Sequence, residues 1–202
     1  MRVTAETKEA TRQKILETAQ ELFRTVGYDS TTTRDIARAA GIATGTLFNY
    51  FATKESIVTG LVADAQRRTA RGMTDEQFES LEEALFAHIS AGLRLLKSYR
   101  TYLTPVLETS LSPLAISDRS DVGQSLRTDH LETVVAIVRQ HELESALTPV
   151  ALQLYWTLYL GVLSFWTNDK SPKQEDTLAL LDQSLAMFVG WLGSDGERTN
   201  VN

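Results

Sequence analysis

Cysteine is absent from this chain of 202 residues, which excludes disulfide bridges, thiolate zinc sites and a cysteine nucleophile. The absence is compatible with a reducing compartment, and we expect a cytoplasmic protein. Proline and glycine are also scarce, at four and 11 residues, while 43% of the residues are hydrophobic. That balance is typical of a globular chain and argues against intrinsic disorder. No apolar stretch follows the first residues, so we predict no secretory signal peptide.

The sequence also lacks the short motifs that accompany many catalytic sites. Its histidines are His88, His130 and His141, and no pair of them has the spacing of a metal site such as H-E-x-x-H. There is no G-x-S-x-G nucleophile elbow, no phosphate-binding loop and no G-x-G-x-x-G dinucleotide motif. We therefore predict that the protein is not an enzyme and holds no metal ion or cofactor.

One long stretch without charge admits two interpretations. No charged residue occurs between Ser145 and Asn168, and the apolar centre, residues 150–166, would form a helix about 25 Å long. The hydrocarbon core of a bilayer is roughly 30 Å thick, and polar residues interrupt the apolar run. We favour a helix that protein covers on several sides over a membrane span, and we expect no membrane partner.

The hydrophobic residues recur with the period of an α-helix throughout, and no alternating strand-like run is present. In the first predicted helix Ile15, Ala19 and Leu22 share one face, and Gly27 marks its end. The sequence therefore predicts an all-α protein. The expected helices cover residues 7–26, 32–40, 44–50, 54–71, 75–98, 100–111, 122–142, 149–168 and 174–192, with a loop at 112–123.

Charge is shared unequally along the chain. Residues 1–71 carry a net charge of +3 and residues 72–202 a net charge of −9, within a total of −6. The total argues against a protein that coats nucleic acid through bulk charge, although it allows a local basic face. A slightly basic N-terminal part on an acidic remainder suits contact with a polyanion at one end only.

The most informative segment runs from Thr32 to Phe51. Thr32 and Asp35 have the spacing of a capping box, and Gly41 suits a tight turn between two short helices. The outer face of the second helix carries small, hydroxyl, amide and aromatic side chains, which suit base edges and phosphate oxygens. On spacing alone, an ordinary helical hairpin with a polar outer face fits this segment equally well.

Residues 9–57 resemble the N-terminal DNA-binding region of the TetR family of transcriptional regulators. The resemblance implies a three-helix, helix-turn-helix DNA-binding domain followed by a larger helical domain for ligand binding and dimerisation. We expect a DNA-binding domain at residues 1–53, a connecting helix at 54–71, the larger domain at 72–193 and a flexible tail at 194–202. The matching positions are Ile15-Leu16, Ala19, Leu22-Phe23, Gly27-Tyr28, Thr32-Thr33, Asp35-Ile36-Ala37, Ala40-Gly41, Gly45-Thr46-Leu47, Tyr50-Phe51 and Thr53-Lys54-Glu55.

The resemblance implies that the helix from Thr44 to Tyr50 lies in the major groove of DNA. The candidates for base reading are Thr44, Thr46 and Asn49. The Tyr50 hydroxyl and the Lys54 ammonium are expected to bind phosphates, and Arg34 to bind either a phosphate or a guanine. The sequence departs from the family pattern at Phe48, where tyrosine is common, and at Ala43-Thr44, which replaces a frequent Ser-Lys pair. The loss of a cation predicts weaker, less salt-dependent binding. The expected DNA-binding residues are Thr33, Arg34, Thr44, Gly45, Thr46, Phe48, Asn49, Tyr50 and Lys54.

The last two predicted helices carry apolar residues on more than one face, which one chain of this size cannot easily cover. A fully internal helix pair is the alternative to a dimer. The resemblance implies a homodimer that pairs through these helices and binds a roughly palindromic double-stranded DNA operator. The candidate interface residues are Trp156, Leu163, Trp166, Leu180, Met187 and Trp191.

The resemblance also implies a pocket for a small-molecule effector between the middle helices and the penultimate one. No sequence cluster of carboxylates or arginines points to a charged effector, so we expect a mostly apolar or aromatic molecule. The candidates are Phe78, Phe86, His88, Tyr102, Tyr155 and Tyr159. Such aromatic residues are more often plain core residues, and for His88 the pattern favours a hydrogen-bonded core histidine over a ligand contact.

Taken together, the resemblance predicts a ligand-released regulator, with repression as the commoner mode in the family. In that mechanism the helix at residues 54–71 belongs to both domains and can tilt as a lever. The alternative is a helical ligand-binding or adaptor protein without sequence-specific DNA binding.

Overall fold

The computed structural model describes residues 4–72, 78–104 and 121–199, and all regular secondary structure within these ranges is helical. The fold class predicted from the sequence is therefore confirmed. We call residues 4–53 the head and residues 78–199 the body. The elements are α1 Ala5–Thr25, α2 Thr33–Ala39, α3 Thr44–Phe48, α4 Lys54–Gly72, α5 Leu81–Leu96, η1 Lys97–Tyr102, α7 Asp121–Gln140, η3 Glu144–Ala146, α8 Pro149–Asn168, η4 Pro172–Gln174 and α9 Glu175–Thr199.

Side-chain caps start α2 in the head and α4, which follows it, whereas α3 begins without one. Asp35 N donates to Thr32 Oγ1 at 3.2 Å while Thr32 N donates to Asp35 Oδ2 at 3.0 Å, which confirms the capping box. The start of α4 is capped in the same way, because Ser56 N donates to Thr53 Oγ1 at 3.1 Å. Gly41 has a φ of 65°, as the tight turn before α3 requires.

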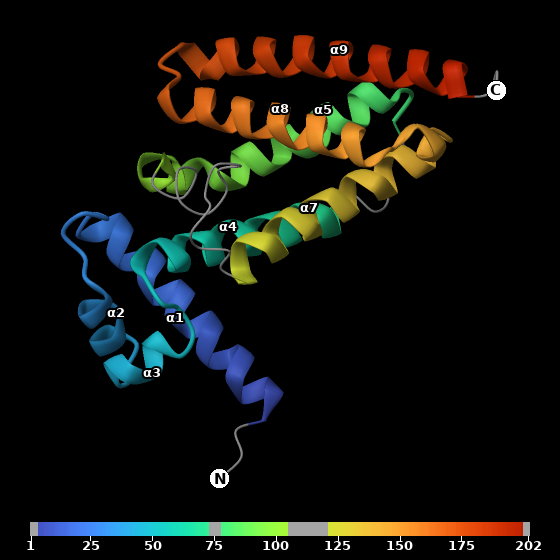
Figure 1. Ribbon diagram of the computed structural model, residues 1–202. Helices are drawn as coiled ribbons and strands as arrows, with labels where there is room; N and C mark the ends of the chain where they lie inside the picture. Colours follow the sequence, from blue (N-terminus) through green and yellow to red (C-terminus); the bar gives the residue numbers. More distant parts are fainter. Residues whose placement is uncertain (1–3, 73–77, 105–120, 200–202) are drawn as a thin grey trace.

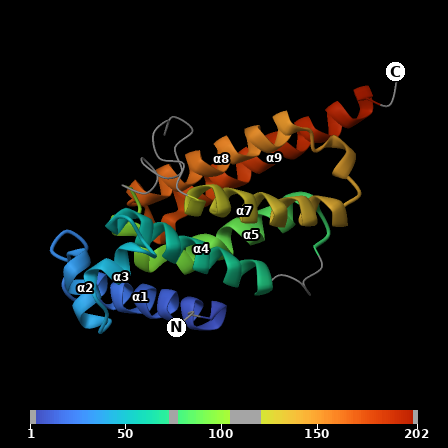
Figure 2. The ribbon, with the colours of Figure 1, turned by 60° about the horizontal axis from the view of Figure 1, so that its bottom comes forward.

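The head lies at one end of the body and is connected to it through α4 (Figure 1). The α1–α3 unit lies at one end, α4 runs from it along the body, and α8 and α9 lie antiparallel on the far side. Figure 2 shows α4, α5 and α7 side by side, with α8 and α9 behind them. Helix α4 packs on α1 in the head and on α5 and α7 in the body, so it belongs to both units.

Helix α4 approaches the head closely at Gly60. A Cβ atom on this residue would lie 2.9 Å from Phe51 Cε1 and 3.0 Å from Leu16 Cδ2, closer than real Cβ contacts. Phe51 and Leu16 are themselves fully buried. The absence of a side chain at Gly60 therefore sets the distance between α4 and the core of the head.

Several predicted boundaries differ from the structure. Helix α5 begins at Leu81 because Ser80 caps it, and after Leu96 the chain tightens into the 3₁₀ segment η1. Helix α7 includes residues 121–123, since a single glycine costs a helix only about 1 kcal/mol. The expected flexible tail is helical to Thr199, where no proline interrupts α9. The helix, loop and tail expectations for residues 73–77, 105–120 and 200–202 lie outside the described residues.

The uncharged stretch forms α8, and the body covers much of it. Tyr155 and Trp166 are 0% exposed, and Trp156 and Tyr159 are 3% exposed. In the part of the chain that the structure describes, no helix is both long and apolar enough to cross a membrane. The interpretation of α8 as a helix buried by protein accounts for these exposures.

Candidate DNA interface, effector site and dimer surface

Helix α3 turns one face into the head and the other to solvent. Leu47 is 0% exposed and closes the core with Ile36 and Phe51, while the Phe48 side chain is 48% exposed. Helix α3 has five residues, so its outward groups come from the helix itself and from the residues that follow it. Gly45, Phe48 and Asn49 are exposed, and Thr44, Thr46 and Tyr50 are half-buried.

Helix α2 adds polar groups beside α3. Arg34 is exposed and Thr33 is half-buried. Two further cations were not predicted from the sequence. Arg38 on α2 forms an ion pair with Asp35, and the ammonium of Lys14 on α1 lies beside the α2–α3 turn, 3.9 Å from the position a Cβ of Gly41 would take. Only the tertiary fold brings Lys14 to this turn.

Lys54 has partners inside the protein. Its Nζ donates to the carbonyl oxygens of Tyr28 at 2.8 Å and Thr31 at 3.2 Å, and it lies 4.0 Å from the centroid of the Tyr28 ring. The ammonium therefore ties the start of α4 to the α1–α2 connection. This arrangement uses two of its three donors, whereas the sequence predicts that the ammonium binds a phosphate.

Tyr102 lies at the junction of head and body, away from the other expected effector residues. Its ring stacks on Tyr28 at 5.3 Å and meets Phe23 edge-on at 5.2 Å. The Tyr28 hydroxyl donates to Glu55 Oε1 at 3.1 Å. The structure therefore places Tyr102 in an aromatic contact between η1 and the head.

Three of the expected effector residues, His88, Tyr155 and Tyr159, do come together in the core of the body. They gather around His130, whose ring stacks on Tyr159 at 4.1 Å and lies 5.4 Å from the ring of His88. His130 Nε2 is 3.2 Å from the Tyr155 hydroxyl, and Gln66 Nε2 donates to the Tyr159 hydroxyl at 3.1 Å. We call these five residues the polar core cluster.

Burial keeps this cluster uncharged. Burial lowers the pKa of His88 to about 4, and burial together with the neighbouring His88 holds the pKa of His130 well below its usual range. Burial also raises the pKa of Tyr159 to about 12. Gln66 Nε2 lies 3.4 Å from His130 Nδ1, and since an amide nitrogen only donates, this fits a neutral ring with its proton on Nε2.

Two polar atoms of the cluster have no hydrogen-bond partner among the described residues. They are Gln66 Oε1 and His88 Nδ1, although His88 is only 4% exposed. The interpretation of His88 as a hydrogen-bonded core histidine is therefore wrong at Nδ1. A buried polar atom left unpaired costs about 1–3 kcal/mol, so both atoms are suited to pair with polar groups of a ligand. Gln66 and His130 could not be predicted from the sequence as members of this cluster, because their partners lie on other helices.

Phe78 and Phe86 lie elsewhere, at the start of α5 facing α9. They line a cavity of about 490 Å³ with Ser80, Glu82, Glu83, Asp182 and Leu185. The expected effector residues therefore belong to three places rather than one pocket. Within the ranges that the structure describes, no group of three or more His, Asp or Glu side chains could hold a metal ion.

The outer surface of α8 and α9 differs from the interface expected from the sequence. Trp156, Leu163 and Trp166 are 3%, 1% and 0% exposed, so the body itself covers them and they cannot meet a partner chain. The α8 stripe chosen from the sequence is the core stripe. The exposed apolar residues on the two helices are instead Val150, Leu154, Phe165, Leu178 and Met187.

On α9 the expected interface residues reach the surface of the single chain. Met187 is 76% exposed, and Leu180 and Trp191 are half-buried. Gly161 on α8 and Gly190 on α9 are exposed, with no atom within 4 Å of an added Cβ. Helices α8 and α9 therefore present a common surface with apolar side chains and two open glycines, which we call the outer α8–α9 face.

Comparison with known proteins agrees with this architecture. Residues 15–61 match the family described as bacterial regulatory proteins, tetR family, and residues 84–198 match the tetracyclin repressor-like C-terminal domain. The HTH-type transcriptional repressor KstR2 of Rhodococcus jostii is 30% identical over 196 residues, which cover 95% of this chain and 84% of that protein. The uncharacterized regulator YvkB of Bacillus subtilis is 26% identical over 193 residues, which cover 92% of this chain and 98% of that protein.

Solved structures show the same fold. A TetR transcriptional regulator from Rhodococcus sp. RHA1 superposes with a TM-score of 0.70 at 18% identity, covering 90% of this chain and 97% of that one. The structure of Thermus thermophilus FadR in complex with lauroyl-CoA superposes with a TM-score of 0.65 at 20% identity. The superposition covers 88% of this chain and 93% of that one. Two matched domains and a relative aligned over nearly the whole chain establish that this protein belongs to the TetR family, as a DNA-binding, ligand-responsive transcriptional regulator.

Proposed function

We propose that this protein represses transcription as a homodimer that places the two α3 helices in the major groove of a roughly palindromic operator. The main support is that α3 buries one face and exposes the other. Leu47 is fully buried in the head, while Gly45, Phe48 and Asn49 are exposed. A helix fixed on one face and open on the other can dock as a rigid body. The name of the Rhodococcus jostii relative, a transcriptional repressor, supports repression.

Within this interface we assign separate tasks to polar groups. Thr44, Thr46 and Asn49 read base edges, and Gly45 lets the backbone approach the groove. The Phe48 ring offers apolar contact, suited to thymine methyl groups. Phosphates are bound by Thr33, Arg34 and the Tyr50 hydroxyl, which lie around α3. Lys54 supports the interface from inside, through its hydrogen bonds to the Tyr28 and Thr31 carbonyl oxygens of the head.

The homodimer forms through the outer α8–α9 face. Val150, Leu154 and Phe165 expose apolar surface on α8, and Met187 does so on α9. The open glycines let two copies of the helix pair approach closely in a four-helix arrangement. A twofold axis through this face presents two heads in matched orientation, which a palindromic operator requires.

The effector enters the body and weakens DNA binding through α4. We place its polar group at Gln66 and His88 of the polar core cluster, where unpaired buried atoms favour a ligand that supplies hydrogen bonds. Gln66 lies on α4 itself, so a ligand there can shift the helix that carries the head. The coupling is reciprocal: effector and operator must weaken each other by the same factor. We expect this exchange to take place in the cytoplasm.

Selection from random duplexes tests the DNA function directly. The full chain should enrich a palindromic sequence at moderate salt, and Asn49→Ala should change the base preferred at one position in each half-site. Asn168→Ala, an exposed asparagine at the end of α8, is the matched control and should select the same sequence as the unaltered chain. A mismatch in a half-site should weaken binding by about 1–3 kcal/mol.

Selection that enriches no sequence would support the adaptor alternative and overturn the proposal. An unchanged preference in Asn49→Ala would overturn the base-reading assignment alone. No catalytic role is proposed for any residue.

A further inference from the structure

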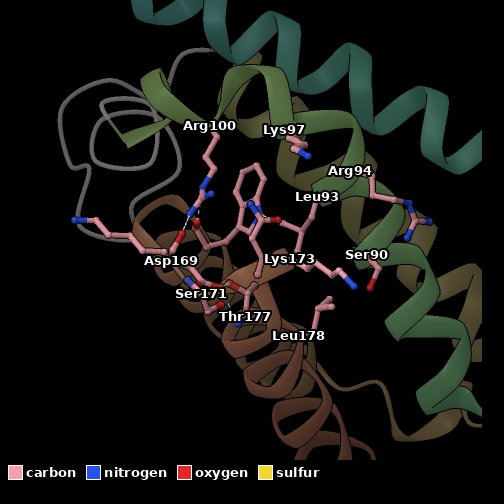
Figure 3. Close-up of a pocket in the computed structure, with 13 residues that line it drawn as sticks. Ser90, Leu93, Arg94, Lys97, Arg100, Asp169, Ser171, Lys173, Thr177 and Leu178 are labelled. Atoms are coloured by element: carbon pink, nitrogen blue, oxygen red, sulfur yellow. Dashed lines mark hydrogen bonds between the residues drawn. The ribbon is translucent and has the colours of Figure 1, made fainter.

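A second cavity lies at the end of the body where α5, η1 and the α8–α9 connection meet (Figure 3). Its volume is about 520 Å³. None of the effector residues expected from the sequence lines this cavity. Trp166, which the sequence suggested for the dimer interface, does line it. The lining residues are Ser90, Leu93, Arg94, Lys97, Arg100, Trp166, Asp169, Lys170, Ser171, Lys173, Gln174, Thr177 and Leu178.

The charge around this cavity is opposite to that of the body. Residues 72–202 have a net charge of −9 and contain nine Lys and Arg residues, of which five line this cavity. Arg94, Lys97, Lys170 and Lys173 form no ion pair within the described part of the chain. Four unpaired cations around one hollow create a local positive potential in an otherwise acidic domain.

The one carboxylate in the lining does not cancel this charge by pairing with it. Asp169 Oδ2 accepts hydrogen bonds from Thr177 Oγ1 at 2.5 Å and Thr177 N at 3.0 Å, and Oδ1 accepts from Ser171 N at 2.7 Å. These bonds hold the pKa of Asp169 well below its usual range. The carboxylate therefore organises the α8–α9 connection and leaves the neighbouring lysines available.

The Ser90 hydroxyl is an unpaired polar group on the cavity wall. Its side chain is 6% exposed, and Oγ has no hydrogen-bond partner among the described residues. In Figure 3 the Lys173 side chain extends toward Ser90 across the cavity. A buried hydroxyl is seldom left unpaired without a reason, and here it faces the same space as the cations. Leu93, Trp166 and Leu178 add apolar surface to that space.

We propose that this cavity binds the anionic group, a phosphate or a carboxylate, of a small amphiphilic molecule. Lys97, Lys173 and Arg94 neutralise the anion, the Ser90 hydroxyl donates to one of its oxygens, and the apolar wall covers the part of the molecule next to it. The proposal names the charge of a ligand, and it rests on the proposed function only in its link to release from DNA.

That link runs through η1. Lys97 and Arg100 of this segment line the cavity, and Tyr102, at its other end, stacks on Tyr28 of the head. Arg100 is anchored to the end of α8, because its Nε donates to the Trp166 carbonyl at 2.7 Å and its Nη2 to the Asp169 carbonyl. An anion that draws Lys97 toward the cavity therefore acts on the same short segment that touches the head.

Calorimetric titration of the full chain with octyl phosphate tests the site. Octanol and octyltrimethylammonium, with the same chain but no negative charge, are the matched controls, and octanoate separates carboxylate from phosphate binding. We expect octyl phosphate or octanoate to bind at least about tenfold more tightly than either control. Equal affinity of the anions and octanol would overturn the proposal.

Variants then locate the site. The double variant Lys97→Gln/Lys173→Gln should weaken anion binding about tenfold, and Ser90→Ala should weaken it about fivefold through the loss of one hydrogen bond. Arg127→Gln removes a body cation outside the cavity and should leave anion affinity unchanged. Unchanged affinity in both the double variant and Ser90→Ala would overturn the assignment. Because Ser90→Ala removes only a buried hydroxyl, it keeps the test valid if the double variant unfolds.

The same proteins should also be assayed on the selected duplex. If the double variant binds the duplex normally but no longer responds to octyl phosphate, both the site and its link to the head are supported. If the protein binds the anion but selects no duplex, the result counts against the proposed DNA function alone. If it binds the duplex but not the anion, the result counts against this inference alone.

Discussion

The rings of Tyr28 and Tyr102 stack with their centroids 5.3 Å apart and their planes 11° from parallel. Tyr28 belongs to the connection after α1 in the head, and Tyr102 ends η1 in the body. The Lys54 ammonium lies on the same Tyr28 ring, so three separate segments meet at one aromatic side chain. The head is thus joined to the body by α4 and, independently of α4, by a ring contact.

Tyr102→Ala should lower the free energy of unfolding by about 3 kcal/mol, because it empties a site that is 5% exposed. Tyr102→Phe keeps the ring and should cost less than about 1 kcal/mol. Urea unfolding measures both values, and amide exchange should show faster opening of residues 27–31 in Tyr102→Ala only. Equal losses in the two variants would show that the hydroxyl, rather than ring packing, stabilises the junction.

Gly60→Ala should destabilise the protein by about 1–3 kcal/mol, since the new methyl group would lie 2.9 Å from Phe51 Cε1. Gly92→Ala in α5, where an added Cβ meets no atom within 4 Å, should instead stabilise it by up to about 1 kcal/mol. Thermal or urea unfolding of the pair gives the comparison. A stabilising Gly60→Ala would contradict the close contact of α4 with the head.

Lys54→Met should weaken binding to the selected duplex without changing its salt dependence, because the ammonium bonds to carbonyls of the head. Arg34→Gln, the control, should reduce the slope of log affinity against log salt by about 0.9, the value for one phosphate contact. Fluorescence anisotropy at several salt concentrations separates the two effects. A slope reduced equally in Lys54→Met would restore Lys54 as a phosphate anchor.

The free energy of unfolding should fall as the pH decreases from 6.5 to about 4, because the folded polar core cluster keeps His88 neutral while the unfolded chain binds a proton. His130 has a lowered pKa too, and each histidine contributes about 1.4 kcal/mol per pH unit in its window. His130→Asn should reduce this slope, whereas His141→Asn, outside the cluster, should not. Urea midpoints across this range provide the measurement, and identical slopes in all three proteins would refute a neutral buried pair.

Met187→Asp should weaken dimerisation by about 3 kcal/mol, roughly a hundredfold in Kd, because a twofold interface buries two carboxylates at once. Met187 is 76% exposed in one chain, so the fold of the monomer should tolerate the change. Leu95→Asp, at an apolar residue of α5 that is 41% exposed, is the control and should leave the dimer intact. Sedimentation equilibrium measures the dimer Kd of each variant. An unchanged Kd in Met187→Asp would show that the dimer interface lies elsewhere.

Much of the head could be predicted because its signals are local. The capping box of Thr32 and Asp35, and the glycine at position 41, depend on residues within a few positions of one another. Backbone groups at helix ends need partners wherever the helix lies, so such motifs determine boundaries on their own. The buried residues of α1 and α3 follow from the same short-range period.

The body could be predicted only in outline. Helix α8 is apolar on several sides, so periodicity did not distinguish the stripe of Trp156 and Trp166 that faces the core from the stripe of Leu154 and Phe165 that faces outward. That choice depends on which neighbouring helices pack on α8. Apolar burial has no direction of its own, and only the assembled structure decides which face it covers.

The sequence by itself determined an all-helical chain, the capping box of α2 and the outward residues of α3, because hydrogen bonding and helical periodicity act over one or two turns. The tertiary structure alone decided where distant charges and rings meet: the cations around the cavity beside Ser90, the pairing of His88 with His130, and the tie of Lys54 to the head. Long-range electrostatic and packing partners are set by how the helices cross, and no local pattern encodes that geometry.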